Sequence, residues 1–199
     1  MKDLNTKQKI TLICLLIVIS GIIGWVYEFI FYYANSGFKT FYYRGGNFLP
    51  WINIYMYGAF LILALTYKFK KKPILVFLIS MVSTGVLEYL SGYILYGVLG
   101  MTKCWDYNNE ILNWGNIDGY VCLRSVLIFG LAGLALVYFI VPTLIKLVKK
   151  YPKLYYISIV LATIFLLDEI YNLVLFKIFN TPSSIDIYKS IGFKYLFYK

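Results

Sequence analysis

The sequence predicts an all-α fold: a polytopic membrane protein, built as a bundle of about five transmembrane helices with a cytoplasmic amino terminus. Two observations carry this prediction. Of the 199 residues, 61% are hydrophobic, and the mean hydropathy is +0.73. A water-soluble globule would not cover so many apolar side chains. Long apolar stretches also recur along the whole chain, and each is long enough to cross a bilayer.

Five segments are predicted to span the membrane, each with about 20 residues or more. They run near residues 9–33, 50–67, 73–99, 119–145 and 154–178. The first is uncharged from Ile10 to Tyr27 and lacks a small-x-small cleavage site, which indicates a retained helix instead of a secretory signal. The second begins at Pro50, and proline is tolerated in the first turn of a helix.

Lysine distribution sets the predicted orientation. Lysines gather in three places: the amino terminus (Lys2, Lys7, Lys9), the 68–72 loop (Lys68, Lys70, Lys71, Lys72) and the 146–153 loop (Lys146, Lys149, Lys150, Lys153). The alternate loops hold only Lys39, Arg44 and Lys103. By the positive-inside rule, the amino terminus is cytoplasmic and the carboxyl terminus lies outside. The tail, 185–199, mixes aromatic and basic residues, so we expect an interfacial segment, with a partial sixth span or disorder as alternatives.

The chain is predicted to form a single membrane domain over residues 1–199, since it has no internal repeat and no low-complexity linker. Without histidine, and with three cysteines at no metal-ligand spacing, no metal or other cofactor is expected. Cys104 and Cys122 both fall near the outer face, where a disulfide is geometrically allowed, while free thiols are the alternative. The basic residues that produce the net charge of +10 lie in short loops, where they indicate the orientation of the chain in the membrane. No nucleic-acid partner is therefore predicted.

Five charged residues interrupt the predicted spans: Glu28, Glu88, Arg124, Asp168 and Glu169. A charge at membrane depth costs from about 2.5 kcal/mol upward, so such residues are usually functional or paired. With a rise of 1.5 Å per residue, all five are expected in the outer half of the membrane. The alternatives are that they snorkel to the interface or form structural ion pairs.

Outer-loop residues are predicted to complete a site at that level. The polar and aromatic candidates are Arg44, Trp105, Asp106, Asn116 and Asp118. Because carboxylates outnumber cations among the intramembrane residues, the predicted ligand is a small cation or a protonated amine. The predicted binding set is therefore Glu28, Glu88, Arg124, Trp105, Asp106, Arg44, Asn116, Asp168 and Glu169.

Several short motifs resemble those of a known family. They are Gly24-Trp25-Val26-Tyr27-Glu28, the Tyr43–Gly58 segment, Leu87-Glu88-Tyr89, Trp105-Asp106-Tyr107-Asn108, and Asn116 to Leu123. Together they resemble the bacterial membrane proteins described as putative ABC-transporter type IV, over residues of about 20–142. Tyr120 stands where the family has arginine, and Arg124, four residues on, would substitute for it if both lay on one helical face.

The resemblance implies a multi-pass protein of the bacterial plasma membrane and, if the label holds, a separate ATPase partner. This chain has no phosphate-binding G-x-x-x-x-G-K-[ST] loop, so it is not itself the ATPase. A homo-oligomer is the other partner that we expect, beside the lipid bilayer, because five spans without a repeat make an unusual autonomous carrier.

Three functions are compatible with these features. The first is a transporter or permease component that binds a small cationic solute in the outer half of the bundle. The second is a structural or accessory membrane protein, with buried ion pairs and with Trp105-Asp106-Tyr107 as a loop-packing motif. The third is a membrane enzyme acting on a lipid-linked substrate, which is less favoured because the chain lacks histidine and a G-x-S-x-G motif.

Overall fold

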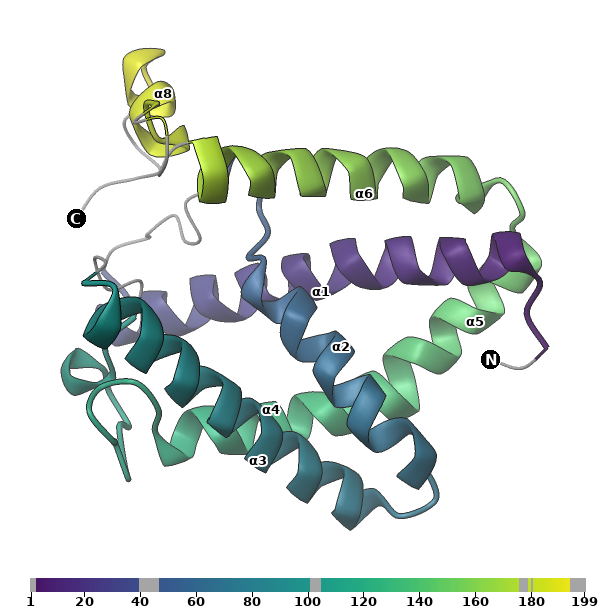
Figure 1. Cartoon of the computed structure of the whole chain (residues 1–199), viewed down its shortest axis with the longest axis horizontal. Helices are drawn as coiled ribbons and strands as arrows, with labels where there is room; N and C mark the ends of the chain where they lie inside the picture. The colour runs from purple at the N-terminus through teal and green to yellow at the C-terminus, as the bar shows by residue number, and fades with distance from the viewer. Residues whose placement is uncertain (1–2, 40–46, 101–104, 176–178, 180, 194–199) are drawn as a thin grey trace. The chain divides into compact units, whose positions relative to one another are not determined.

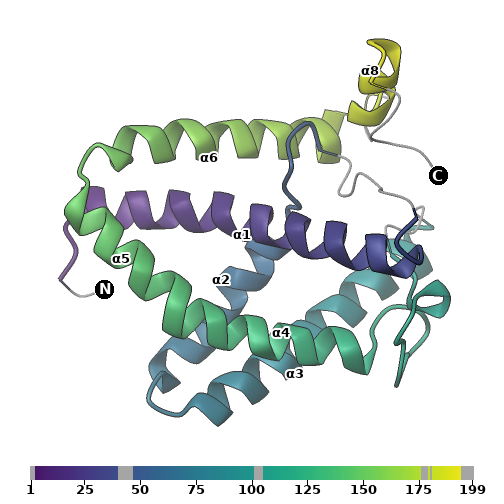
Figure 2. The ribbon, with the colours of Figure 1, turned by 180° about the vertical axis from the view of Figure 1, so that it is seen from behind.

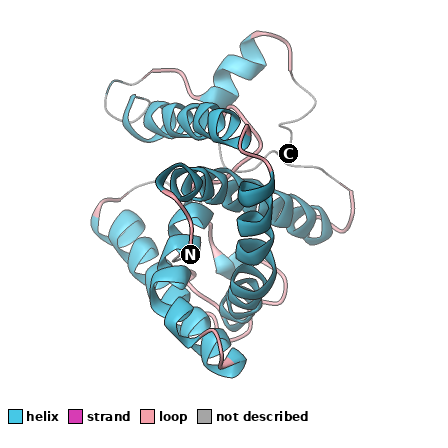
Figure 3. Ribbon diagram, turned by 90° about the vertical axis from the view of Figure 1, so that its right-hand side faces the viewer, coloured by secondary structure: helices cyan, strands magenta, loops and turns pink. Residues whose placement is uncertain are grey.

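The computed structural model describes residues 3–39, 47–100, 105–175, 179 and 181–193. Their regular structure is helical, apart from one isolated antiparallel bridge between Ile117 and Val121 (Figure 3). The predicted all-α class is therefore confirmed. The chain divides into two compact units, one formed by Met1–Met56 with Leu144–Lys199 and the other by Tyr57–Thr143.

The first unit is built on two helices that lie side by side, α1 (Thr6–Asn35) and α6 (Leu154–Ile170), as Figures 1 and 2 show. Asn5 begins α1 through a capping box, in which Asn5 and Gln8 exchange side-chain to backbone hydrogen bonds of 2.9 and 3.0 Å. The π-helical turn η5 (Tyr171–Leu175) extends α6, and the short helix α8 (Ser184–Ser190) follows. At Gly21 of α1 a Cβ would lie 2.5 Å from the Phe165 ring, so this glycine permits close packing of the pair.

The second unit is centred on α3 (Pro73–Gly92) and α4 (Leu123–Ala135), which pack against each other. A Cβ at Gly85 would lie 2.7 Å from Val126, which shows how closely the two backbones approach. The π-helical turn η2 (Tyr93–Val98) extends α3. Two further elements, α2 (Ile54–Thr66) and the 3₁₀ turn η1 (Tyr67–Phe69), precede α3 in the chain.

A third π-helical turn, η4 (Leu136–Ile140), joins α4 to α5 (Val141–Lys150). Pro142 lies directly after it and has no N–H to donate to the preceding turn. Its ring would also crowd the carbonyl four residues earlier, and a widened turn relieves that conflict. The helix therefore continues without a break from Leu123 to Lys150.

Three helices are long and apolar enough to cross a membrane: Thr6–Asn35, Pro73–Val98 and Leu123–Lys150. They correspond to the predicted spans 9–33, 73–99 and 119–145. The apolar helix Ile54–Phe69 is shorter, and its predicted beginning at Pro50 is wrong. The Phe48 and Leu49 N–H groups bind a side chain of α6, which holds this segment out of the helix. The number of spans and their orientation stay predictions.

Candidate functional site

Glu88 lies on α3 and receives hydrogen bonds from two hydroxyl groups. One comes from Tyr107, in the short 3₁₀ turn η3 (Tyr107–Asn109) of the loop between α3 and α4. The other comes from Ser125 in the first turn of α4, at 2.8 Å. Ser125 also closes the capping box that begins α4 at Cys122. The Glu88 carboxylate thus joins α3, the loop and the start of α4.

Arg124 lies one residue before Ser125 but pairs with a different carboxylate. Its Nη2 is 2.6 Å from Glu110 Oε2, and the two side chains are only 7% and 6% exposed. Nη1 donates to the Ile111 carbonyl at 3.0 Å. The guanidinium also lies over the Tyr107 ring, 5.3 Å from its centroid, which is a cation–π geometry. The buried pair is therefore Arg124 with Glu110.

Tyr107 connects these two features and is itself buried. Burial, followed by the nearby Glu88 carboxylate, raises the pKa of the Tyr107 phenol above its ordinary value. The phenol consequently stays protonated and remains a hydrogen-bond donor to Glu88. We call Glu88, Tyr107, Glu110, Arg124 and Ser125 the Glu88 cluster; all five belong to the second unit.

The loop that carries Tyr107 is folded by its own polar side chains. Asp106 accepts hydrogen bonds from the Asn108 backbone N–H at 3.1 Å and from the Asn108 side chain at 2.8 Å. Asn116 donates to Asn108 at 2.7 Å and accepts from the Gly119 N–H at 3.0 Å. Trp105 donates its indole N–H to the Tyr120 carbonyl at 2.9 Å. These bonds fit the loop-packing interpretation of the Trp105-Asp106-Tyr107 motif.

Gly119 is required for this loop conformation. Its φ of +76° is in the left-handed region, and a Cβ there would contact Asp106 Oδ1. The Gly119 carbonyl also accepts a hydrogen bond of 3.0 Å from the Tyr107 N–H. The glycine thus holds Asp106 and Tyr107 in register, so that Tyr107 points inward while Asp106 is used in the turn.

In the first unit, Asp168 of α6 is buried and binds a segment far away in sequence. Its carboxylate accepts from the Phe48 N–H at 3.0 Å and the Leu49 N–H at 3.2 Å. The Trp51 indole N–H and the Asn172 amide add bonds of 2.8 and 2.7 Å. Four donors use the roughly four lone-pair positions of a carboxylate. We call this arrangement the Asp168 anchor, because it fixes residues 48–51 onto α6.

Glu28 belongs to a second polar contact of the first unit. Tyr55, in the first turn of α2, donates its hydroxyl to Glu28 at 3.2 Å. The Tyr55 ring packs on Gly24, where a Cβ would collide with it. Gly24 and Glu28 are one helical turn apart on α1, so both face the same tyrosine. This geometry explains physically why glycine and glutamate occur together in Gly24-Trp25-Val26-Tyr27-Glu28.

A family model described as Putative ABC-transporter type IV matches residues 15–173, which is more than half of the chain. The chain belongs to this family. The match includes every residue of the predicted binding set and extends beyond the 20–142 segment in which the resemblance was recognised. No curated protein and no solved structure matches the chain. The family's description and the three long apolar helices are consistent with a transport-related membrane protein.

The motifs of this putative ABC-transporter type IV protein meet in pairs within each unit. Glu88, from Leu87-Glu88-Tyr89, contacts Tyr107 of the Trp105 motif. Glu28, from the first motif, contacts Tyr55 of the second. Glu169 is buried on α6 beside Asp168. Arg44 and Cys104 lie outside the described residues, as does any bond between Cys104 and Cys122; Cys122 itself is buried.

One sequence-based inference needs correction. Tyr120 and Arg124 do not share a helical face, because α4 begins only at Leu123, after the cap at Cys122. Tyr120 lies in the loop, where a Cβ at Gly92 would be 2.8 Å from its ring. Arg124 therefore takes no position equivalent to Tyr120.

Two residues of the Glu88 cluster, Glu110 and Ser125, were absent from the predicted set. Glu110 follows the Trp105-Asp106-Tyr107 motif in a polar loop, where a carboxylate carries no signal of burial. Ser125 closes a capping box with Cys122, but this pairing differs from the usual Ser or Thr cap with Glu or Gln three positions later, so it carried no clear signal. Tyr107 belongs to the Trp105-Asp106-Tyr107 motif, but no binding role was predicted for it.

Proposed function

We propose that this protein is the membrane-embedded component of a transport system, and that Glu88 is the carboxylate through which a small cationic solute binds. One observation carries the proposal. Glu88 accepts hydrogen bonds from two neutral hydroxyls, whereas the guanidinium of Arg124 pairs with Glu110. Among the described residues, no cationic side chain forms an ion pair with Glu88.

Charge balance supports a cationic ligand. The one guanidinium of the Glu88 cluster pairs with Glu110, so an ionised Glu88 has no ion-pair partner among the described residues. An uncompensated charge in a low-dielectric region is costly, so a bound cation or protonated amine would stabilise the cluster. Glu88 is only half-buried, so it is not sealed from a ligand.

Asp168, another carboxylate of the same chain, differs from Glu88 in its burial and hydrogen bonding. Its carboxylate is buried and already accepts bonds from four donors. A solute at Asp168 would have to displace the backbone N–H groups that hold residues 48–49. We therefore assign Asp168 to structure and Glu88 to binding. Asp106 and Asn116 support the loop that presents Tyr107, and we propose no direct solute contact for them.

Thermal melting of the purified protein in detergent tests the proposal. Alkali-metal ions and simple organic ammonium ions are compared at constant ionic strength, and a ligand of the folded state should raise the melting temperature by mass action. The Glu88→Gln variant should lose the response to the active cation. Asp3→Asn, which removes the same charge from an exposed residue, should keep it.

Two outcomes would overturn the proposal. One is that no cation raises the melting temperature of the unmodified protein. The other is an equal response in Glu88→Gln and Asp3→Asn, because the effect would then be nonspecific. A lower melting temperature in Glu88→Gln together with an unchanged cation response would favour the structural alternative, in which Glu88 only ties the loop to α3 and α4.

We also propose five spans with the amino terminus inside, so that α2 with η1 and α6 with η5 complete the bundle. The lysine clusters at 68–72 and 146–153 support this orientation. In a cysteine-free background, a cysteine at Asn109 should react with an impermeant reagent from outside, and one at Lys70 should not. Reaction at Lys70 in intact cells would contradict the orientation. Energy would come from a partner ATPase or an ion gradient, since the chain has no phosphate-binding loop.

A further inference from the structure

A cavity lies in the first unit, and none of its lining residues carries a carboxylate. It has a volume of about 280 Å³ and is formed where the start of α1, the end of α5 and the start of α6 meet. Its lining includes Lys7, Gln8, Thr11, Lys153, Tyr155 and Tyr156. We call it the lysine pocket.

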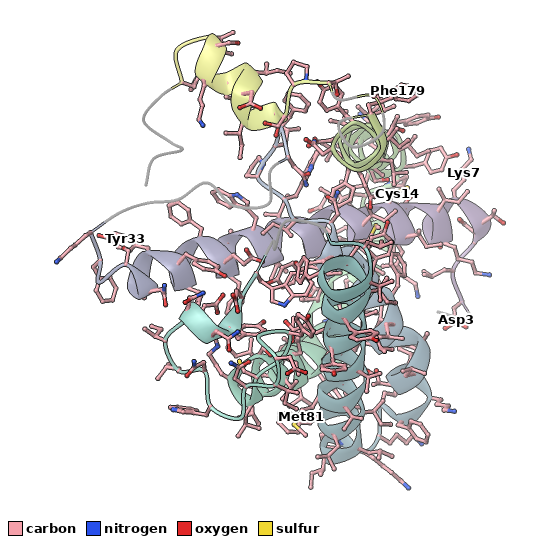
Figure 4. All side chains as sticks on the ribbon, turned by 60° about the vertical axis from the view of Figure 1, so that its left-hand side comes forward. Asp3, Lys7, Cys14, Tyr33, Met81 and Phe179 are labelled. Carbon is pink, nitrogen blue, oxygen red and sulfur yellow. The ribbon has the colours of Figure 1, made fainter. Side chains whose placement is uncertain are left out.

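The lysine pocket is strongly cationic. Lys7 and Lys153 line it, and α5 ends beside it with Lys149 and Lys150 in its last turn. Within the part of the chain that the structure describes, neither lining lysine forms an ion pair with a carboxylate. Figure 4 shows Lys7 extending away from Asp3, although the two are close in sequence. The pocket therefore presents positive charge that no described acidic side chain neutralises.

Helix geometry adds to this positive charge. Both α1 and α6 begin at the lysine pocket, at Thr6 and Leu154. The amino-terminal end of a helix carries a partial positive charge, so both helices favour an anion there. The contribution is secondary to that of the lysine side chains, but it has the same sign.

Two tyrosines line the same pocket. The Lys7 ammonium lies 5.7 Å from the centre of the Tyr155 ring. The rings of Tyr155 and Tyr156 are 5.3 Å apart, and Tyr156 is 67% exposed. Neither tyrosine hydroxyl donates to another described residue. Lysine ammonium and phenol donors together are well suited to the oxygen atoms of a phosphate group.

The position of the pocket indicates that the phosphate belongs to a lipid. Two membrane-crossing helices end here, since Thr6–Asn35 begins and Leu123–Lys150 finishes at the pocket. The pocket is therefore at the depth of lipid headgroups, where tyrosines and lysines are enriched. Exposed apolar side chains follow on α1 and α6, with Ile10 at 37% and Ile157 at 54% exposure, and they would meet acyl chains.

We propose that the lysine pocket binds the phosphodiester headgroup of an anionic glycerophospholipid. The Lys7 and Lys153 ammonium groups donate to the phosphate oxygens, and the tyrosine hydroxyls complete the headgroup contacts. Basic pockets between helices at the cytoplasmic face are typical sites for such headgroups. The site is independent of the solute bound at Glu88.

Native mass spectrometry and thermal melting of the full-length protein in detergent test the proposal, with phosphatidylglycerol compared against phosphatidylcholine. Phosphatidylglycerol should bind and raise the melting temperature, and phosphatidylcholine should not. The double variant Lys7→Gln with Lys153→Gln should bind phosphatidylglycerol about ten- to thirtyfold more weakly, from about 1 kcal/mol for each lysine. The double variant Lys7→Arg with Lys153→Arg should retain most of the affinity, which separates loss of charge from loss of fold.

The matched control is Lys71→Gln with Lys72→Gln. It removes two exposed lysines from the 68–72 loop, which is not part of the lysine pocket. An equal loss of phosphatidylglycerol binding in both Gln double variants would contradict the proposed site. The loss would then reflect a general attraction between lysines and the anionic lipid. Equal binding of phosphatidylglycerol and phosphatidylcholine would contradict the proposed preference of the pocket for an anionic headgroup. If inorganic phosphate raised the melting temperature as much as phosphatidylglycerol does, the ligand of the pocket would be a soluble phosphate and not a lipid.

Discussion

The hydroxyl of Tyr107 donates a hydrogen bond to the carboxylate of Glu88, and this contact joins the loop between α3 and α4 to α3. The ring of the same tyrosine lies under Arg124, 5.3 Å from the guanidinium carbon. One loop side chain thus touches Glu88 and Arg124, the charged residues of the two long apolar helices of the second unit. Glu88 and Arg124 are thereby coupled through Tyr107, while the ion pair of Arg124 is made with Glu110.

Alkaline pH should destabilise the protein through Tyr107. Its pKa in the folded state is raised above the ordinary value of about 10, mainly by burial. The folded phenol then keeps its proton where the unfolded one releases it, so this contribution to stability is complete below about pH 10 and is lost as the pH rises above it. Melting temperatures between about pH 8 and 11 should fall less steeply for Tyr107→Phe. Parallel curves for the two proteins would contradict the assignment.

Glu110→Gln should be strongly destabilising, because it leaves the buried Arg124 guanidinium without its counter-charge. Breaking one member of a buried pair costs about 3–5 kcal/mol. Adding Arg124→Met should recover most of that loss, as measured by a double-mutant cycle on denaturant unfolding. The control cycle pairs Glu88→Gln with Arg124→Met and should show little recovery. Equal recovery in both cycles would mean that Arg124 is shared between the two carboxylates.

Gly24→Ala should destabilise the first unit, since the new methyl group would collide with the Tyr55 ring. Overpacking of this kind costs about 1–3 kcal/mol. Gly58→Ala is the matched control, because Gly58 also lies in a helix but has open space around its Cβ position. That change should be neutral or stabilise by about 0.5–1 kcal/mol. Similar melting temperatures for the two variants would show that the Gly24 contact is unimportant.

Asp168→Asn should loosen residues 48–51. The neutral amide keeps one acceptor oxygen but presents an NH₂ group to N–H donors, and a hydrogen bond to a charged group is worth about 1.5–3 kcal/mol. We expect a lower melting temperature and a shifted indole N–H resonance of Trp51. Asp3→Asn should change neither. An unshifted Trp51 resonance in Asp168→Asn would contradict the Asp168 anchor.

Local sequence predicted the helices well because a helix is encoded within each segment. Apolar runs located the three long helices, because the residues that form each helix follow one another in the chain. Prediction failed where a distant partner intervened. Pro50 is tolerated at a helix start, but α2 begins at Ile54 because Asp168 binds the Phe48 and Leu49 N–H groups from about 120 positions away.

The amino-acid sequence by itself determined that this is a helical membrane protein and which charged residues interrupt its apolar segments. Those properties depend on composition and on the period of the helix, which are local. Only the tertiary structure decided the partners of these charges: Asp168 accepts from four donors, Arg124 pairs with Glu110, and Glu88 receives only hydroxyls from the described residues. Hydrogen bonding and ion pairing depend on which distant groups the fold brings within about 3 Å, and a linear pattern does not contain that distance.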